Sequence, residues 1–259
     1  MPPRRTSAPD AGPVAGERLD RVLVGRGLAP SRTRAQRLIA GGHVLVAGRP
    51  ARKASDPVAD PASIVVSGDD CPWVSRGGLK LDFALRHFAI EVRDKVALDL
   101  GASTGGFSEV LLARGAIQVV AVDVGHGQLH PRLTAQPRLI RHEGLNVRDL
   151  TAAHLPEAPD LIVADLSFIS LTVALPAALA LAKPDARLVA LVKPQFEVGR
   201  ALLGKGGLVR DRAAREAALA KIRDWLAAQS GWSILGGVES PIAGGHGNRE
   251  YLLAAARHA

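Results

Sequence analysis

Short apolar segments alternate with helical segments from Lys95 to the C-terminus of this 259-residue chain, and this alternation restricts the possible folds most strongly. It is typical of a mostly parallel sheet that carries helices on both faces. The last two apolar segments leave no room for a helix between them, so we expect an antiparallel hairpin at one edge. The predicted strands cover residues 96–100, 117–122, 139–140, 161–164, 187–192, 232–238 and 250–256. The expected fold is an α/β, doubly wound, seven-stranded domain.

Charged side chains mark the ends of four predicted strands: Asp99, Asp123, Asp165 and Lys193. A buried strand has no structural need for charge, whereas ligands of open α/β sheets bind beyond the carboxyl ends of the strands. For any single residue, a solvated strand end is an equally good explanation. The four together predict a functional site at this edge of the sheet.

A glycine-rich turn, residues 101–106, follows the first of these strands. Glycines let a ligand approach the backbone closely. Asp123 lies 22 residues beyond Gly101, where an acidic residue accepts hydrogen bonds from ribose hydroxyls. NAD is a competing cofactor, but the spaced G-x-G-x-x-G pattern is absent and the terminal hairpin favours a methyltransferase. The predicted cofactor-binding residues are Asp99, Gly101, Ser103, Thr104, Gly105, Gly106, Phe107, Asp123, Val124, Asn146, Asp165 and Leu166. For Asn146, a simple turn residue is an equal interpretation.

Lys80, Asp165, Lys193 and Glu250 form the predicted catalytic set. A ribose hydroxyl is a poor nucleophile until its proton is removed or its oxygen is stabilised. We expect Lys193 nearest that oxygen, either as a neutral base whose pKa is lowered by Lys80 or as an electrostatic clamp oriented by Asp165. Glu250 would hold Lys80. Beside a nucleoside-cofactor loop, this set predicts methyl transfer to a ribose hydroxyl.

The N-terminal residues carry most of the excess positive charge. Residues 1–67 contain 11 basic and 5 acidic residues, a net charge of +6 out of +8 for the whole chain. Two predicted helices and the strands 44–46 and 64–66 form a small unit over residues 17–67, and the second helix presents three arginines on one face. A basic lobe favours a polyanionic partner, most often nucleic acid. The predicted RNA-binding residues are Arg18, Arg21, Arg32, Arg34, Arg37, Arg52 and Lys53.

This N-terminal unit resembles the S4 RNA-binding domain, in which a basic helix face binds structured RNA. The family often has Asn where this chain has Ala47. The resemblance is carried by Arg18-Leu19-Asp20, Gly27-Leu28, Ser31-Arg32, Ala35, Leu38-Ile39, Gly42, Val44, Val46 and Gly48.

Residues 17–259 as a whole resemble the TlyA (hemolysin A) family, which joins an S4 domain to an FtsJ-like methyltransferase. The matching segments are 73–81, 99–107, 122–129, 164–170, 192–197 and 247–251. The resemblance implies a Rossmann-like class I fold, S-adenosyl-L-methionine (SAM) as methyl donor, and a cytidine 2′-hydroxyl of ribosomal RNA or ribosomal subunits as acceptor. It places the family's Lys-Asp-Lys-Glu tetrad on Lys80, Asp165, Lys193 and Glu250. The implied divisions are a disordered tail (1–16), an S4-like domain (17–67), a linker (68–74) and a methyltransferase domain (75–259).

Two other functions remain open from the sequence. The chain could be an RNA-binding protein with a catalytically inactive SAM-binding domain. It could also be an α/β serine hydrolase, because Gly101-Ala102-Ser103-Thr104-Gly105 matches the G-x-S-x-G motif and Asp165 and His246 follow in hydrolase order.

Composition limits the possible cellular location and argues against disulfides and membrane-spanning helices. A single cysteine, Cys71, rules out an internal disulfide and fits a cytoplasmic location. The 17 uncharged residues 166–182 contain Pro176 and fall short of the roughly 20 that a membrane-spanning helix needs. We expect no metal site and no membrane association, and the sequence leaves the oligomeric state open.

Overall fold

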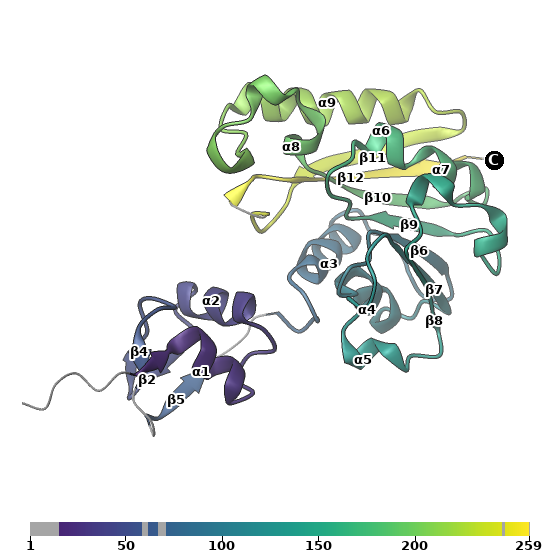
Figure 1. Cartoon of the computed structure of the whole chain (residues 1–259). Helices are drawn as coiled ribbons and strands as arrows, with labels where there is room; N and C mark the ends of the chain where they lie inside the picture. The colour runs from purple at the N-terminus through teal and green to yellow at the C-terminus, as the bar shows by residue number, and fades with distance from the viewer. Residues whose placement is uncertain (1–15, 59–61, 67–70, 245–246, 259) are drawn as a thin grey trace, which may run out of the picture. The chain divides into compact units, whose positions relative to one another are not determined.

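In a computed structural model, the chain divides into two compact units, Met1–Pro72 and Trp73–Ala259 (Figure 1). The structure describes residues 16–58, 62–66, 71–244 and 247–258, and each unit is considered by itself. Apart from Gly16, the predicted tail lies outside the described residues, as do residues 68–70 of the predicted linker.

The first unit packs two helices against short strands around one small core. Ser31 caps the second helix as predicted, because its hydroxyl accepts a hydrogen bond from Arg34 N at 3.2 Å. Leu19, Leu23 and Leu38 lie in the core. The elements are β1 (Glu17–Arg18), α1 (Leu19–Gly25), α2 (Arg32–Ala40), β2 (Val44–Val46), β3 (Arg49–Pro50), β4 (Pro57–Val58) and β5 (Ile64–Val66), paired as β1-β4 and β3-β2-β5.

The turn between β2 and β3 contains the residue at which this chain differs from the S4 pattern. Ala47 and Gly48 both have positive φ angles, of 48° and 75°. The left-handed region disfavours most residues with a side chain but is tolerated by Asn and Gly. The Asn that the S4 family often has here therefore suits this turn better than Ala47.

The second unit contains a seven-stranded sheet in the order β11-β12-β10-β9-β6-β7-β8. Strands β6 to β10 run parallel, and β12 is antiparallel to both of its neighbours. The strands are β6 (Val96–Leu100), β7 (Gln118–Asp123), β8 (Leu139–Glu143), β9 (Leu161–Ala164), β10 (Arg187–Val192), β11 (Trp232–Glu239) and β12 (Tyr251–Arg257). The predicted class I methyltransferase fold, with its terminal antiparallel hairpin, is confirmed.

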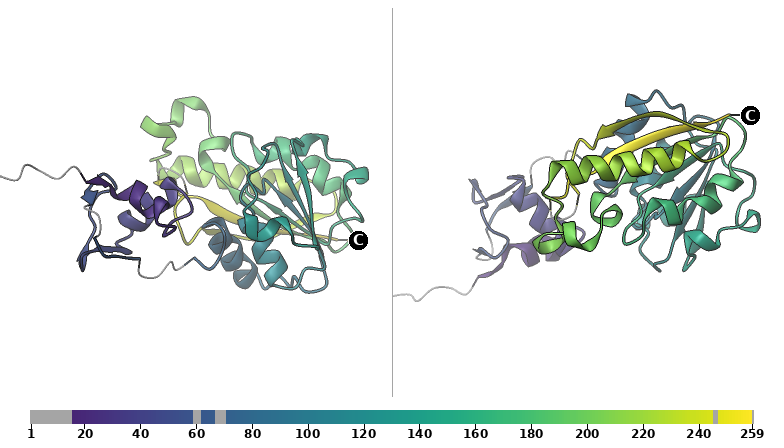
Figure 2. Two further views of the ribbon diagram at one scale, coloured as in Figure 1. Left: turned by 60° about the horizontal axis from the view of Figure 1, so that its bottom comes forward. Right: turned by 90° about the horizontal axis from the view of Figure 1, so that it is seen from above.

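Helices cover both faces of this sheet, as Figures 1 and 2 show. The helices are α3 (Gly77–His87), α4 (Gly106–Ala113), α5 (Pro131–Thr134), α6 (Leu171–Ala174), α7 (Pro176–Leu181), α8 (Pro194–Glu197) and α9 (Arg212–Ala227). Short 3₁₀ turns are η1 (Val147–Asp149), η2 (Ala152–His154), η3 (Arg200–Leu202) and η4 (Lys205–Gly207).

Alternate residues of each central strand pack against opposite helical layers. In β6, Leu98 belongs to the core formed with α6, α7 and α9, whereas Ala97 belongs to the core formed with α3 and α4. Successive side chains of a strand point to opposite faces of a sheet. Since helices cover both faces, the central strands are buried on both sides, which explains the nearly continuous apolar runs in the sequence, interrupted in β6 by the buried Asp99.

Two segments differ in detail from the sequence prediction. The uncharged run 166–182 forms two short helices, α6 and α7, and Pro176 begins the second one, where its missing N–H is tolerated. Strand β8 extends to Glu143 rather than ending at Ile140, because its polar residues continue the parallel pairing with β7.

Candidate active site

Three predicted catalytic residues lie at one edge of the sheet because their strands are neighbours. Asp165 directly follows β9 and Lys193 directly follows β10. Glu250 directly precedes β12, which runs antiparallel to β10 and pairs Tyr251 with Val192. The sheet order β12-β10-β9 therefore places all three residues at the carboxyl edge of the parallel strands.

The fourth residue, Lys80, reaches this edge from helix α3. A Cβ added to Gly77 would lie 3.5 Å from Asp165 Oδ2, so the first turn of α3 packs against the end of β9. Lys80 is three residues further on and therefore lies on the same helix face. The structure thus brings all four predicted catalytic residues to one region.

The four residues form two ion pairs with different exposure. Lys193 Nζ lies 2.6 Å from Asp165 Oδ1 and donates a hydrogen bond of 2.9 Å to Ser167 Oγ. Lys80 Nζ lies 2.5 Å from Glu250 Oε2. The side chains of Lys193 and Asp165 are 11% and 23% exposed, against 9% and 2% for Lys80 and Glu250. The first pair is therefore the more exposed of the two, mainly through Asp165, and the second pair is nearly buried.

Glu197 joins the two segments that carry the accessible pair. It is buried in α8, four residues after Lys193, and its carboxylate accepts hydrogen bonds from Ser170 Oγ at 2.6 Å and Leu171 N at 2.8 Å. Ser170 caps α6, five residues after Asp165. Lys221 of α9 donates to the main-chain oxygen of Glu197 at 3.0 Å. No role was predicted for Glu197 from the sequence, because its partners Ser170 and Leu171 lie 27 and 26 residues away along the chain.

An exposed aromatic side chain stands beside the same segments. Phe168 is 91% exposed with a positive φ of 65°, and its ring centroid lies 5.1 Å from that of Phe196. A large apolar side chain in a left-handed conformation at the surface is unusual. The sequence analysis did not single out Phe168, because its exposure depends on the turn after β9.

The glycine-rich turn approaches Asp165 closely. Gly101 has a φ of +83°, and a Cβ at this position would lie 2.7 Å from Asp165 O. Gly105 has a φ of +93° and precedes α4, whose buried first residues include Gly106 and Phe107. The turn is therefore adjacent to the predicted catalytic residues, and only glycine fits at Gly101.

Two aspartates on β6 and β7 offer acceptors next to this turn. Asp99 is fully buried and accepts a hydrogen bond from Ser108 Oγ at 2.6 Å, while its Oδ1 has no partner among the described residues. Burial, with smaller contributions from the charges of Asp165 and Asp123, raises the pKa of Asp99 to about 7, although the hydrogen bond from Ser108 opposes the rise. Asp123 Oδ2 accepts from Ser103 N at 2.8 Å, and its Oδ1 accepts from Gly125 N at 2.7 Å.

The other predicted cofactor residues lie around these groups with varied roles. Ser103 is exposed and donates to Gln128 Oε1 at 3.1 Å. Asn146 caps η1 by accepting a hydrogen bond of 3.1 Å from Arg148 N, which is the turn-residue interpretation. Thr104 is partly buried in the turn, Val124 is exposed directly after β7, and Leu166 is partly buried directly after Asp165.

Within the first unit, a buried acid holds two of the predicted RNA-binding arginines. Asp20 accepts two hydrogen bonds of 3.0 Å from Arg18, one of 3.2 Å from Arg32 and one of 2.9 Å from Gln36. The hydrogen bonds from Arg18, followed by that from Gln36, lower the pKa of Asp20 well below its ordinary range. Part of the positive charge of Arg18 and Arg32 is therefore neutralised inside the unit.

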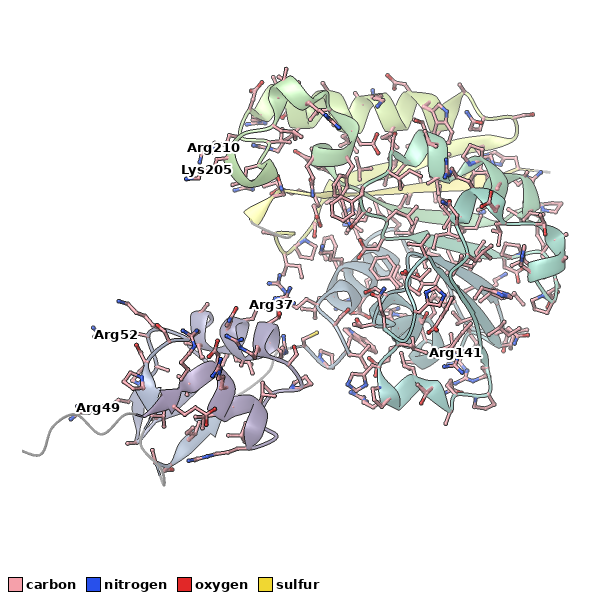
Figure 3. All side chains as sticks on the ribbon, in the orientation of Figure 1. Arg37, Arg49, Arg52, Arg141, Lys205 and Arg210 are labelled. Atoms are coloured by element: carbon pink, nitrogen blue, oxygen red, sulfur yellow. The ribbon has the colours of Figure 1, made fainter. Side chains whose placement is uncertain are left out.

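The remaining basic residues of this unit spread over its surface. Arg21, Arg37, Arg52 and Lys53 are exposed, and Arg34 is partly buried. Arg49 is exposed as well and extends outward from β3, as Figure 3 shows. The sequence analysis missed Arg49, whose neighbour Pro50 suggested only a connecting loop.

The geometry does not support the hydrolase alternative. The Ser103 hydroxyl donates to Gln128, and Asp165 forms an ion pair with Lys193. His246, the third hydrolase candidate, lies outside the described residues.

Residues 16–58, 62–66, 71–244 and 247–258 contain neither a cluster of metal ligands nor a helix that could span a membrane. Within these ranges, no three His, Cys, Asp or Glu side chains gather closely enough to hold a metal ion. The helices of the same ranges are all too short or too polar to cross a membrane.

Comparison with known proteins agrees with this geometry. Residues 73–257 match the model of the FtsJ-like methyltransferases, and residues 17–69 match that of the S4 domain. The chain belongs to the FtsJ-like methyltransferase family. Within it, the predicted relationship to the TlyA (hemolysin A) proteins, which carry both domains, is confirmed. Membership implies SAM as the methyl donor.

Similar proteins align with nearly the whole chain. A 16S/23S rRNA (cytidine-2′-O)-methyltransferase TlyA of Mycobacterium tuberculosis is 49% identical over 238 residues, which are 91% of this chain and 88% of the relative. A hemolysin A of Brachyspira hyodysenteriae is 39% identical over 91% of this chain and 98% of its own. A solved structure of a Streptococcus thermophilus protein named as a hemolysin is 38% identical, with a TM-score of 0.75 over 93% of this chain and 88% of that one.

Proposed function

We propose that this chain transfers a methyl group from SAM to the 2′-hydroxyl of a cytidine in ribosomal RNA. The observation that carries the proposal is the accessible Lys193–Asp165 ion pair, 2.6 Å long, beside a glycine-rich turn at the carboxyl edge of the sheet. The Mycobacterium tuberculosis relative, named for this reaction, supports the substrate class. Ribosomal RNA or a ribosomal subunit is the proposed partner, and the cytoplasm the proposed location.

The residues around the turn fit the chemistry of SAM. The unpartnered, buried Asp99 Oδ1 and the carboxylate of Asp123 are hydrogen-bond acceptors, which suit the ammonium and ribose hydroxyl groups of the donor. The close approach at Gly101 keeps the turn free of side-chain bulk near Asp165. When bound, SAM supplies an electrophilic methyl group on a positively charged sulfur.

Lys193 is proposed to stabilise the attacking ribose oxygen. The hydroxyl that would accept the methyl group has to lose its proton, and the negative charge that develops on its oxygen needs a nearby cation. Lys193 forms an ion pair with Asp165 and donates a hydrogen bond to Ser167, which suits an ammonium that can donate another N–H to the oxygen. This arrangement supports an electrostatic clamp over a neutral base, with the proton leaving to solvent. Lys80 and Glu250 support the pair from the buried side.

Phe168 and Phe196 are proposed to receive the base of the target nucleotide. Enzymes and RNA-binding modules commonly stack an unpaired base on exposed aromatic side chains. Phe168 offers such a surface three residues after Asp165, and its ring is next to Phe196, three residues after Lys193.

The proposal is tested by incubating the full chain with isotopically labelled SAM and ribosomal RNA from each subunit, then mapping 2′-O-methyl groups at nucleotide resolution. We expect one or a few labelled cytidine riboses with the wild type and none with Lys193→Ala. Binding of SAM and RNA without any label would instead support the inactive RNA-binding alternative. Label on a base rather than a ribose would contradict the proposed acceptor.

A further inference from the structure

The loop between α8 and α9 carries positive charge that its surroundings do not neutralise. Lys205 and Arg210 are exposed, and neither side chain has a hydrogen bond or ion pair among the described residues. Figure 3 shows both side chains at the outer end of this loop, pointing away from the sheet. Residues 204–210 are called the 204–210 loop below.

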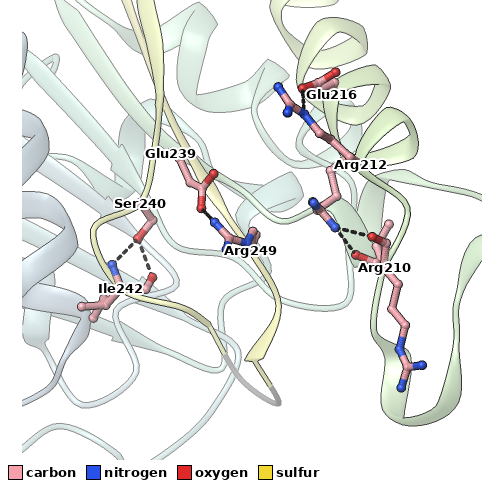
Figure 4. Close-up of polar contacts among 9 residues, drawn as sticks. Arg210, Arg212, Glu216, Glu239, Ser240, Ile242 and Arg249 are labelled. Atoms are coloured by element: carbon pink, nitrogen blue, oxygen red, sulfur yellow. Dashed lines mark hydrogen bonds and ion pairs between the residues drawn. The ribbon is translucent and has the colours of Figure 1, made fainter.

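Three nearby arginines, by contrast, already have partners. Arg249 forms an ion pair with Glu239, and Arg212 pairs with Glu216 at 2.7 Å (Figure 4). Arg215 donates hydrogen bonds to the main-chain oxygens of Val209 at 3.0 Å and Arg210 at 2.6 Å. These contacts fix the loop and leave Lys205 and Arg210 as its uncompensated charges.

Asn248 fastens this loop to the segment that carries Glu250. It is 3% exposed, accepts a hydrogen bond of 3.1 Å from Val209 N, and donates one of 3.1 Å to Gly207 O. Glu250 is two residues further along, and its carboxylate packs against Gly244, where a Cβ would overlap it. These contacts hold the loop next to the catalytic edge.

We propose that the 204–210 loop binds the phosphodiester backbone of the substrate RNA next to the target nucleotide. This inference rests on the proposed function, since the position of the target ribose follows from Lys193 and Glu250. A ribose in a strand of RNA is flanked by phosphates on both sides, and each carries a negative charge. Lys205 and Arg210 supply two cations to those phosphates, and the Asn248 contacts hold the loop in place before binding.

The test measures RNA binding by the full chain to a protein-free ribosomal RNA transcript over a series of KCl concentrations. The variant is Lys205→Ala/Arg210→Ala. Each lost phosphate contact reduces the slope of log affinity against log salt by about 0.7–0.9. We expect the slope to fall by about 1.4–1.8, with SAM affinity unchanged and the single-turnover methylation rate at saturating RNA within about twofold of wild type.

Two control variants separate local charge from total charge. Arg93→Ala/Arg141→Ala removes two exposed arginines, one before the amino end of β6 and one on the edge strand β8, and should leave the slope within error of wild type. Lys205→Arg/Arg210→Lys keeps both charges and should restore most of the slope.

Three outcomes would overturn the inference. The first is a slope for Lys205→Ala/Arg210→Ala that matches the Arg93→Ala/Arg141→Ala control. The second is an affinity loss seen with intact ribosomal subunits but not with protein-free RNA, which would make a ribosomal protein the partner. The third is a methylation rate that falls at saturating RNA, which would place these side chains in the chemical step. Failure of the proposed function is a separate result, because wild-type enzyme would then leave ribosomal RNA unlabelled whatever the slopes show.

Discussion

At the scale of single residues, the two ion pairs differ in burial, and substitutions in them therefore report on different properties. Removing either member of the Lys80–Glu250 pair leaves an uncompensated charge in a site that is almost fully buried. Such a change destabilises a protein strongly, so its effect on activity mixes folding with chemistry. The Lys193–Asp165 pair is accessible, and substitutions there report on catalysis more directly.

Lys193→Ala should abolish most methyl transfer while SAM and RNA binding persist. A positioned group of this kind contributes about 10²–10⁴-fold to the rate. Single-turnover transfer of labelled methyl to ribosomal RNA measures it, with calorimetric titration of SAM as the binding control. Lys193→Arg distinguishes the two possible roles, because a guanidinium keeps the charge but cannot act as a base. Partial activity in Lys193→Arg supports the clamp, and an alanine variant within about threefold of wild type would remove Lys193 from the mechanism.

Asp99 should make stability fall as the pH rises toward neutrality. Its pKa is about 7 in the folded protein, because burial disfavours the charged form, against about 3.9 in an unfolded chain. The folded state therefore holds a proton that the unfolded state releases, and this favourable contribution is complete below pH ~4 and is lost as pH rises through about 7.

Urea unfolding between pH 4 and 8 measures this effect when wild type is compared with Asp99→Asn. The asparagine retains a hydrogen-bond partner for Ser108 but cannot ionise. We expect the difference in unfolding free energy to change by up to about 1.4 kcal/mol per pH unit across that window. Parallel stability curves for the two proteins would show that Asp99 does not titrate there.

At the scale of elements, the accessible pair depends on the contact between two loops that follow neighbouring strands. Glu197 at the end of α8 accepts hydrogen bonds from Ser170 and Leu171 at the start of α6. The loop after β9 is thereby fixed to the segment after β10. The 2.6 Å distance between Lys193 and Asp165 is maintained by this contact as well as by their own attraction.

Glu197→Gln should lower the maximal rate of methyl transfer about tenfold without weakening SAM binding. An amide offers one acceptor where the carboxylate serves two donors, and a hydrogen bond to a charged group contributes about 1.5–3 kcal/mol. The measurement is kcat and KM for RNA, together with the dissociation constant for SAM.

Lys221→Ala is the matched control. Lys221 contacts Glu197 from α9, and no hydrogen bond joins its side chain to the loop after β9 among the described residues. It should change kcat less than Glu197→Gln does. Equal losses of kcat in both variants, with matching losses of thermal stability, would reduce Glu197 to a general structural role.

At the scale of the whole molecule, positive charge is concentrated in one of the two units. The first 67 residues hold six of the eight net charges. In that unit Asp20 engages Arg18 and Arg32, while the second unit adds the 204–210 loop. RNA affinity is therefore expected to come from both units, and chemistry from the second alone.

Replacing Arg32, Arg34 and Arg37 by alanine should weaken RNA binding and flatten its salt dependence, with the SAM affinity unchanged. Arg32 should contribute less than a fully solvated arginine would, because Asp20 already holds it at 3.2 Å. Salt-dependent binding of the triple variant and of each single variant tests this. A triple variant with the wild-type salt slope would place the RNA-binding face elsewhere on the unit.

The sequence by itself determined the positions of the strands and the charges at their ends. Apolar runs and glycine turns are local signals, so β6, β9 and β10 could be predicted closely, together with Asp99, Asp165 and Lys193 beside them. The resemblance to a known family assigned Lys80, Asp165, Lys193 and Glu250 to one catalytic tetrad.

Only the tertiary structure decided which of these charges meet. Lys80 and Glu250 are 170 residues apart in the sequence, and sheet order and helix packing bring them to 2.5 Å. The fold also brings Arg32 to Asp20, and Val209 of the 204–210 loop to Asn248. Long-range contacts follow from strand register and the burial of apolar faces, which no local stretch of sequence encodes. The sequence therefore supplied the reactive groups, and the fold determined which of them are paired, buried or available to a substrate.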